Sequence, residues 1–272
     1  MIPAANLQEG SCAVEADIIS YSVADMSERR RFGARNIAGG RNDVCWELNM
    51  PIDAVLLDID GTLVDSNEFH VTAWHRAFHE VSISIAPELI RKQIGKGADM
   101  LIPALAPDLP EHRRQSVAER HSEIFKSEFL PRVKAFPNAH DLIGALHSSG
   151  REVILASSSD QAEVGHYVQL LGVQELLRAT TSADDVDKSK PAGDIFASAL
   201  QKTSSKEPDN AVAIGDTPYD VIAAAKCGIR TIALRSGGFT DDELLSSHPI
   251  AIYEDVSELY DCLPTSVLSD ET

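Results

Sequence analysis

Short apolar runs alternate with amphipathic segments from Ala54 onward, and this alternation limits the folds that the chain can adopt. The clearest runs are AVLL at 54–57, EVILAS at 152–157, AVAIG at 211–215 and TIAL at 231–234. Apolar runs of this length are typical of strands that are buried on both faces. Strands that alternate with helices predict a Rossmann-like, doubly wound parallel sheet of the α/β class.

The segments between these runs predict helices, several of which stop at a glycine. We expect helices at 138–149, at 161–171, after Pro191 and at 219–227. The stretch from 66 to about 135 holds no comparable apolar run, and its spacing predicts helices at 66–81, 87–93 and about 111–129. This stretch is therefore predicted to be a helical insertion after the first strand.

The chain divides into four predicted parts. They are an N-terminal extension at 1–50, a core domain made of 51–66 and 136–265, a helical cap at 67–135 and a flexible tail at 266–272. The extension shows no sustained helical or strand period, so we expect it to be disordered. A second hypothesis is that translation starts at Met50, directly before the first strand.

The charge balance excludes several classes of partner. The 272 residues include 42 Asp and Glu against 24 Lys and Arg, which gives a formal net charge of -18. This charge disfavours unspecific binding to nucleic acid or to an anionic membrane, and no apolar run reaches the length of a membrane span. The cysteines show no CxxC spacing, so we expect reduced thiols in a cytoplasmic protein. For its assembly we expect a monomer or a weak homodimer.

Polar residues stand where the predicted strands end. Asp58 and Asp60 follow the first run, Ser157 ends the second, and Asp216 and Asp220 follow the third. Because ligands bind beyond the carboxyl ends of the strands in such sheets, these side chains should meet. Asp58 and Asp60 project to the same side of an extended segment, with Cα atoms roughly 6.5 Å apart. Taken alone, DIDG is equally explained as a turn.

These motifs, in this order, resemble those of the haloacid dehalogenase-like hydrolase superfamily. They are DIDGTLVDS at 58–66, the serine after an apolar strand, the pair Lys190-Pro191 and GDTPYD at 215–220. The resemblance covers residues 54 to about 263. The helical insertion resembles the cap of the phosphoglycolate phosphatase and β-phosphoglucomutase branch, whereas the first fifty residues lie outside the resemblance.

The resemblance implies a Mg²⁺-dependent phosphatase whose nucleophile is Asp58. Attack on phosphorus by this carboxylate forms an aspartyl-phosphate, while Asp60 protonates the leaving alcohol and later activates water. Asp58, Asp216, the backbone carbonyl of Asp60 and, through a water, Asp220 are implied to hold the metal. Lys190 is implied to place its charge on nucleophile and phosphate. Asp220 is also explained as an acid at a helix N-terminus.

Phosphate binding is implied for Gly61, Ser157 and the amide of Ser158. Gly61 lets the backbone turn and approach an anion closely. A hydroxyl and a nearby amide donate to phosphoryl oxygens. Ser158 and Ser159 are alternatively explained as caps of the next helix. Lys188 competes with Lys190 for the role of the working lysine, which the family pattern puts directly before proline.

The cap offers fewer candidates. Lys96, between two glycines, is expected either to reach the distal part of the substrate or to be a solvated surface lysine. His70 and Trp74 match the spacing of the β-phosphoglucomutases, and a helix-face histidine beside a core tryptophan is the alternative. We assign the remaining candidates to solvated helix faces: His112, His121, His140 and His166.

The leading hypothesis is a phosphomonoester hydrolase of phosphoglycolate phosphatase type that acts on a small phosphorylated metabolite. The alternative is a phosphosugar mutase of β-phosphoglucomutase type, although such mutases carry Glu-Asp where this chain has GDTPYD. The second acid, Asp60, argues against a dehalogenase, because dehalogenases of the superfamily lack it. A non-catalytic binding module is a third hypothesis, and it is disfavoured because every expected catalytic position is filled.

Overall fold

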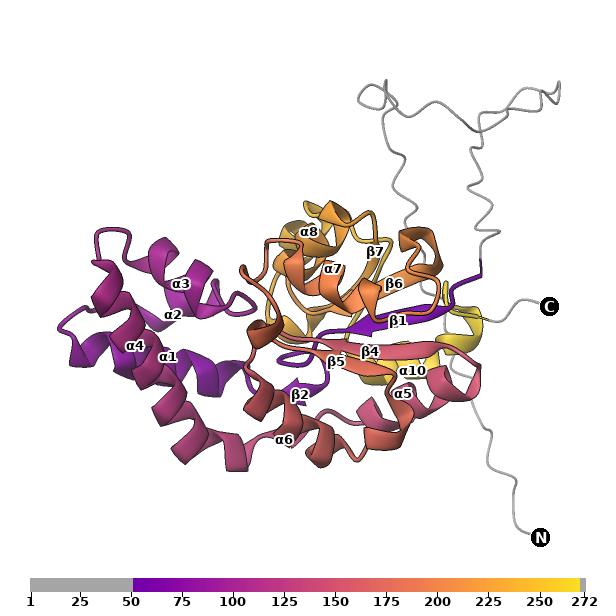
Figure 1. Ribbon diagram of the computed structural model, residues 1–272, viewed down its shortest axis with the longest axis horizontal. Coiled ribbons are helices and arrows are strands. Elements are labelled where there is room, and N and C mark those ends of the chain that lie inside the picture. Colours follow the sequence, from indigo (N-terminus) through magenta and orange to yellow (C-terminus); the bar gives the residue numbers. More distant parts are fainter. Residues whose placement is uncertain (1–50, 270–272) are drawn as a thin grey trace, which may run out of the picture. The chain divides into compact units, whose positions relative to one another are not determined.

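The computed structural model describes residues 51–269, and it contains a parallel sheet between helical layers (Figure 1). The sheet has the strand order β5-β4-β1-β6-β7-β8, and all its neighbouring strands are parallel. The strands are β1 (Ala54–Leu57), β4 (Glu152–Ala156), β5 (Ala179–Thr181), β6 (Ala211–Gly215), β7 (Arg230–Leu234) and β8 (Ala251–Tyr253). This arrangement confirms the predicted doubly wound α/β fold.

The two faces of the sheet bury alternate residues of each strand, as the pleat requires. Ala54 and Leu56 of β1 join a core cluster with α7 (Asp194–Gln201) and α8 (Pro218–Lys226). Val55 and Leu57 join the opposite cluster, with α5 (Ala139–Ser148), α6 (Gln161–Leu171) and α10 (Val256–Asp261). Figure 1 shows α7 and α8 on one side of the sheet and α5 and α10 on the other. Burial on both faces explains why the central strands are apolar throughout.

Two strands and two helices of the core were not predicted. β5 and β8 lie at the edges of the sheet and have three residues each, ATT and AIY, and four of these six residues are only partly buried. Edge strands need no continuous apolar run, so their sequences give a weak signal. The helices that the prediction omitted are the short α9 (Asp241–Leu245) and α10.

The predicted insertion is helical. It contains α1 (Asn67–Glu80), α2 (Pro87–Arg91), α3 (Ala98–Leu105) and α4 (Glu111–Ile124), followed by the π-helix η2 (Phe125–Phe129). The helix predicted at 111–129 is thus α4 continued by a π-helix. α3 was not predicted, because Pro103 lies inside it and proline normally ends a helix.

The chain enters and leaves the cap through neighbouring segments. β2 (Val64–Asp65) pairs antiparallel with β3 (Lys134–Ala135), with Val64 opposite Ala135. β2 ends before the range predicted for the cap, 67–135, and β3 forms the last two residues of that range. At the other end, Leu268 is buried in the core, so the described part of the predicted tail packs against it.

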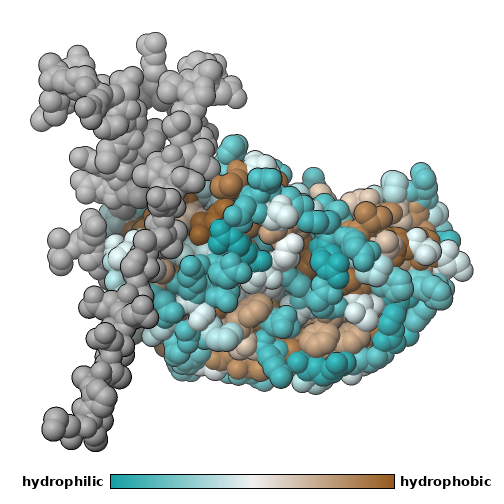
Figure 2. All heavy atoms as spheres, turned by 180° about the vertical axis from the view of Figure 1, so that it is seen from behind, coloured by the Kyte–Doolittle hydropathy of each residue, from teal (hydrophilic) through white to brown (hydrophobic). Residues whose placement is uncertain are grey.

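The remaining elements are single turns of 3-10 helix. They are η3 (Leu130–Arg132), η4 (Gln174–Leu176), η5 (Ala183–Asp185), η6 (Pro208–Asn210), η7 (Arg235–Gly237) and η8 (Leu263–Thr265). Within residues 51–269 no helix has the length and apolar character needed to cross a membrane. Figure 2 shows polar and apolar residues interspersed over one face, as on an ordinary solvated surface. The predicted extension at 1–50 and the proposed start at Met50 lie outside the described residues.

Candidate active site

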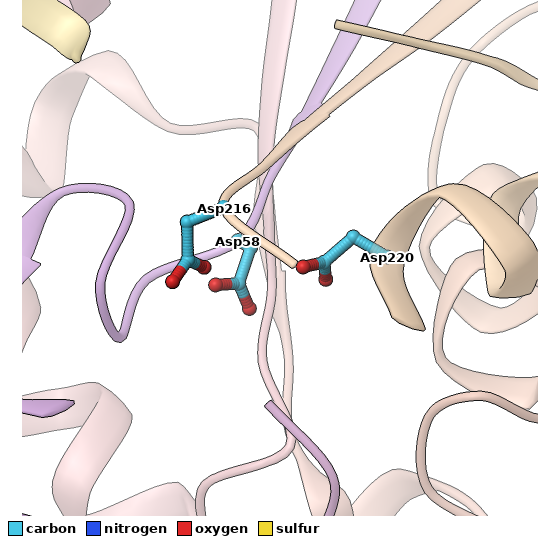
Figure 3. A group of neighbouring side chains, drawn as sticks. All are labelled: Asp58, Asp216 and Asp220. Atoms are coloured by element: carbon cyan, nitrogen blue, oxygen red, sulfur yellow. The ribbon is translucent and has the colours of Figure 1, made fainter. Parts of the chain in front are cut away.

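Three predicted site residues directly follow adjacent strands. Asp58, Ser157 and Asp216 come immediately after β1, β4 and β6, and β1 lies between the other two strands. The sheet therefore brings these side chains to one edge, as the topology predicts. Asp220 joins them from the first turn of α8, and Figure 3 shows its carboxylate turned toward Asp58.

Three of these carboxylates form a compact buried group. Asp58, Asp216 and Asp220 each offer an oxygen, and these atoms lie within 4.8 Å of one another. The ammonium group of Lys190, fully buried, contacts Asp58 Oδ1 and lies 2.7 Å from Asp220 Oδ1. The alternative lysine, Lys188, is exposed. Lys190 is therefore the lysine that the fold brings to the carboxylates.

Burial of like charges governs the ionisation of this group. Burial raises the pKa of Asp58 to about 7. The positive charge of Lys190 lowers this pKa, and the negative charge of Asp220 raises it further. Burial and the charges of Asp58 and Asp220 raise the pKa of Asp216 well above its ordinary value. Burial lowers the pKa of Lys190, but the charges of Asp220 and Asp58 outweigh it, and the pKa is raised. One ammonium thus balances only part of the carboxylate charge.

The cluster of the three carboxylates Asp58, Asp216 and Asp220 is suited to bind a small divalent cation. Its donors are hard oxygens, which Mg²⁺ prefers, and the negative charge that Lys190 leaves unbalanced favours a cation between them. Asp220 serves a second purpose, because its Oδ2 accepts from the backbone amide of Thr217 at 3.1 Å in a capping box that starts α8. Asp220 is therefore both an acid at the N-terminus of a helix, as the alternative explanation states, and a partner of Lys190.

Gly61 is required by close packing as well as by its backbone angle. Its φ is +78°, and a Cβ atom there would lie 2.1 Å from Asp216 Oδ2 and 2.2 Å from Asn67 Nδ2. Asn67 Nδ2 donates to Asp216 Oδ2 at 3.0 Å. Thr62 Oγ1 lies 3.1 Å from Asp58 Oδ2 and 3.0 Å from Asp216 Oδ1. The turn after β1 thus fixes both carboxylates, through residues that the prediction did not include.

Asp60 has a different environment from Asp58. Its carboxylate accepts hydrogen bonds from Ser66 Oγ at 2.6 Å, Ser159 Oγ at 2.7 Å and Tyr167 OH at 2.9 Å. Burial raises the pKa of Asp60, but hydrogen bonds from His70, Ser66 and Ser159 and the charge of His70 lower it well below its usual value. Ser66 stands at the N-cap position of α1, but its hydroxyl makes no capping bond to that helix.

His70 links Asp60 to the cap. Its Nε2 lies 3.2 Å from Asp60 Oδ1, and its Nδ1 lies 3.3 Å from His121 Nε2. Trp74 stacks on His121 with ring centres 3.8 Å apart, and Phe125 stacks on His70 at 3.7 Å. The assignment of His121 to a solvated face is wrong. Residue 121 follows 117 and precedes 124 on the buried face of α4, a spacing that could have revealed it.

The three consecutive serines differ in their contacts. Ser157 is buried, and its Oγ accepts from the backbone amide of Ser159 at 3.0 Å. Ser158 Oγ lies 3.4 Å from the carbonyl oxygen of Gly95 in the cap. The alternative that a serine caps α6 is wrong, because Asp160 is the N-cap and accepts from the amides of Ala162 and Glu163.

A pocket of about 350 Å³ lies between these strand ends and the cap. Asp58, Asp60, His70, Lys96 and the three serines are among the residues that line it. Lys96 Nζ donates to Gln93 Oε1 at 2.5 Å and lies 4.4 Å from the centre of the Tyr219 ring. Lys96 therefore reaches the pocket, but its ammonium group already has partners.

The cap loop at 95–99 packs closely against the core. A Cβ atom on Gly97 would lie 2.1 Å from Ser189 Oγ, and Asp99 Oδ2 accepts from the amide of Ser189 at 3.0 Å. Ser189 directly precedes Lys190. The glycine beside Lys96 thus allows a close contact with the loop that carries the buried lysine.

The comparisons with known proteins agree with this geometry. The model of a family described as haloacid dehalogenase-like hydrolase matches residues 55–234. Pyrophosphatase PpaX of Oceanobacillus iheyensis is 25% identical over 214 residues, which cover 77% of this chain and 96% of that protein. A phosphoglycolate phosphatase of Salmonella paratyphi A is 25% identical over 237 residues, which cover 78% of this chain and 92% of that protein. A crystal structure of a hydrolase from Pseudomonas syringae is 26% identical with a TM-score of 0.74, and the match covers 78% of this chain and 98% of that one.

Proposed function

Because this chain belongs to the haloacid dehalogenase-like hydrolases, we propose that it is a Mg²⁺-dependent phosphomonoester hydrolase of the phosphoglycolate phosphatase-like branch. Its substrate is a small phosphorylated metabolite, and its place of action is the cytoplasm. The observation that carries the proposal is the contact of Asp58 with the buried Lys190 beside Asp216 and Asp220.

Asp58 is the proposed nucleophile. The carboxylate oxygen that Lys190 does not contact, Oδ2, attacks phosphorus. A bond forms between that oxygen and phosphorus, and the bond from phosphorus to the alcohol oxygen breaks. Lys190 fixes the orientation of Asp58 and offsets its charge. Asp58, Asp216, the Asp60 carbonyl and, through a water, Asp220 would hold Mg²⁺, which would screen the repulsion between carboxylate and phosphate. The substrate phosphate oxygens accept from Ser157 and from the Ser158 amide.

Asp60 is the proposed acid and base. In the first step it gives a proton to the departing alcohol oxygen, and in the second it takes a proton from the water that attacks the aspartyl-phosphate. The donors around it favour the carboxylate, which is the form needed for the second step. The negative charge of a bound phosphate favours the protonated form needed for the first, because like charges disfavour ionisation.

One contact favours the phosphosugar mutase as a second candidate. His70 Nε2 lies 3.2 Å from Asp60 Oδ1 and connects the proposed acid to α1 of the cap, as coupling between cap closure and chemistry requires. In a mutase the phosphate returns from Asp58 to a sugar hydroxyl instead of to water. The hydrolase is preferred because the chain has GDTPYD where the mutases have Glu-Asp.

A panel of phosphorylated metabolites with Mg²⁺ tests the proposal. Release of free phosphate that stops when EDTA removes the metal supports a hydrolase. Isomerisation of a sugar phosphate without phosphate release identifies the mutase. Lack of any turnover on the panel supports a non-catalytic binding module.

A further inference from the structure

The pocket has two ends of different chemistry. We call the group of Asp58, Asp60, Asp216, Asp220 and Lys190 the reaction end. The distal end is made of the cap loop at 95–99 together with Asp160, Glu163 and Asp187, which line the pocket. If phosphate binds at the reaction end, the alcohol part of a substrate is left to contact the other residues that line the pocket.

The distal end is acidic. Asp99, Asp160, Glu163 and Asp187 line it, and Asp160 is paired with Lys126, which does not line the pocket. Lys96 is the one lysine or arginine among the pocket-lining residues of the described chain. The ammonium of Lys96 is held by Gln93 and by the face of Tyr219. A carboxylate on the alcohol part of a substrate would therefore meet like charges and no free cation.

Glu163 differs from the other acids of the distal end because its side chain is almost fully buried and accepts no hydrogen bond within the described residues. Its exposed fraction is 5%, and within residues 51–269 no hydrogen bond to its side chain is found. A glutamate three residues after an N-cap usually bonds back to the amide of the N-cap residue. Asp160 caps α6, but Glu163 does not make this return bond. Its side chain lines the pocket instead.

Glu163 also lies near the group that would protonate the leaving alcohol. Tyr167, one turn later on the same face of α6, donates to Asp60 Oδ1 at 2.9 Å. The charges of His70 and Asp60 act on Glu163, and burial raises its pKa to about 7. An alcohol oxygen close to Asp60 therefore brings its neighbouring substituents to Glu163.

Resting on the proposed function, we propose that Glu163 is the specificity-determining residue of this pocket. Its carboxylate accepts a hydrogen bond from a hydroxyl of the substrate's alcohol part. The enzyme consequently selects phosphate esters of sugars and polyols over phosphate esters of hydroxy acids. A buried carboxylate without a hydrogen bond lowers the stability of the fold. We explain the presence of Glu163 at this position by a hydrogen-bond donor that the substrate supplies.

Three probes test this inference on the full-length protein with Mg²⁺: glucose 6-phosphate, 2-phosphoglycolate and 4-nitrophenyl phosphate. We expect kcat/KM to be at least tenfold higher for glucose 6-phosphate than for 2-phosphoglycolate. Glu163→Leu should lower kcat/KM for glucose 6-phosphate by about 10- to 100-fold, mainly through KM, because a hydrogen bond to a charged group is lost. For 4-nitrophenyl phosphate, whose alcohol part has no hydroxyl, the loss should be several times smaller.

Two further variants complete the experiment. Glu175→Gln, an exposed acid just after α6 and outside the pocket, is the matched control and should behave like the unmodified protein. Glu163→Lys should raise the ratio of 2-phosphoglycolate to glucose 6-phosphate turnover. If a Glu163 variant does not fold, the substrate ranking of the unmodified protein still decides.

The outcomes separate the inference from the proposed function. Equal losses on all three probes, or a preference of the unmodified protein for 2-phosphoglycolate, overturn the role of Glu163 while the hydrolase stands. If none of the probes, including 4-nitrophenyl phosphate, releases phosphate, the proposed function fails and the inference fails with it.

Discussion

The reaction end and Glu163 of the distal end differ in how completely their polar groups are paired. At the reaction end Asp58 and Asp220 contact Lys190, Asp216 accepts from Asn67, and Asp60 accepts from several donors. At the distal end Glu163 has no hydrogen-bond partner within the described residues, although it is almost fully buried. The difference shows that the protein supplies partners for the groups proposed to carry out the reaction. In the described part of the chain, it supplies none for the group proposed to recognise the substrate. The predictions below test this division.

The largest expected effect is that of Asp60→Asn, which removes the ionisable carboxyl group of Asp60 but leaves a side chain of the same size. The amide cannot exchange the proton in either step, so kcat should fall by about 100- to 10,000-fold. Phosphate release from the best substrate measures the loss, and circular dichroism checks that the fold is intact. Full activity of the folded variant would contradict the role of Asp60.

Removing the buried cation tests whether the pairing at the reaction end also stabilises the fold. Lys190→Met leaves Asp58 and Asp220 buried and unpaired, so the free energy of unfolding should fall by about 3–5 kcal/mol. Urea denaturation without added metal measures the change. Lys188→Met, at an exposed position two residues away, is the matched control. Equal stability of the two variants would show that Lys190 does not stabilise the carboxylates.

A single donor to Asp60 should matter less. Tyr167→Phe removes the hydroxyl that lies 2.9 Å from Asp60 Oδ1 and keeps the ring in the core. Since a hydrogen bond to a charged acceptor contributes about 1.5 kcal/mol or more, kcat should fall by about tenfold. Tyr260→Phe, on α10 away from the pocket, is the control. Similar losses in both variants would contradict a specific role of Tyr167.

The smallest expected effect concerns pH and His121. Burial and the charge of His70 lower the pKa of His121 well below its usual 6.5, so the unfolded chain binds the proton more readily than the folded protein. Neutral His121 therefore contributes fully to the free energy of unfolding above pH 6.5. This contribution declines as the pH falls below 6.5.

His121→Phe should keep the stack on Trp74 and remove this decline. The loss of stability between pH 7.5 and 5.5 should become smaller by up to about 1.4 kcal/mol per pH unit. The raised pKa of His70 acts in the opposite direction, since its contribution is full at low pH and is lost as the pH rises. Urea denaturation at both pH values, with exposed His112→Asn as control, measures the difference. Parallel pH profiles of His121→Phe and the unmodified protein would contradict the account.

The sequence was sufficient to predict the fold class and the strand-end residues. AVLL, EVILAS and AVAIG are apolar because both faces of their strands are buried, and a parallel sheet must bring Asp58, Ser157 and Asp216 together. Lys190 was identified by the resemblance, and the structure brings it to Asp58.

The supporting residues could not be predicted in the same way. Tyr167 reaches Asp60, and His121 reaches His70, through the orientation of whole helices, α6 and the inserted α4, which local spacing does not define. Ser66 and Ser159 looked like helix caps, since a serine before a helix usually has that role. Their hydroxyls donate to Asp60 instead, because the tertiary structure places a buried carboxylate within reach.

The most direct test of the account is to trap the phosphorylated enzyme. Acid quenching within milliseconds of mixing with a turned-over substrate and Mg²⁺, followed by peptide mass spectrometry, locates any acyl phosphate. The account predicts phosphate on the peptide that contains Asp58, and none in Asp58→Asn. Turnover without a phosphorylated peptide, or phosphate on another residue, would contradict it.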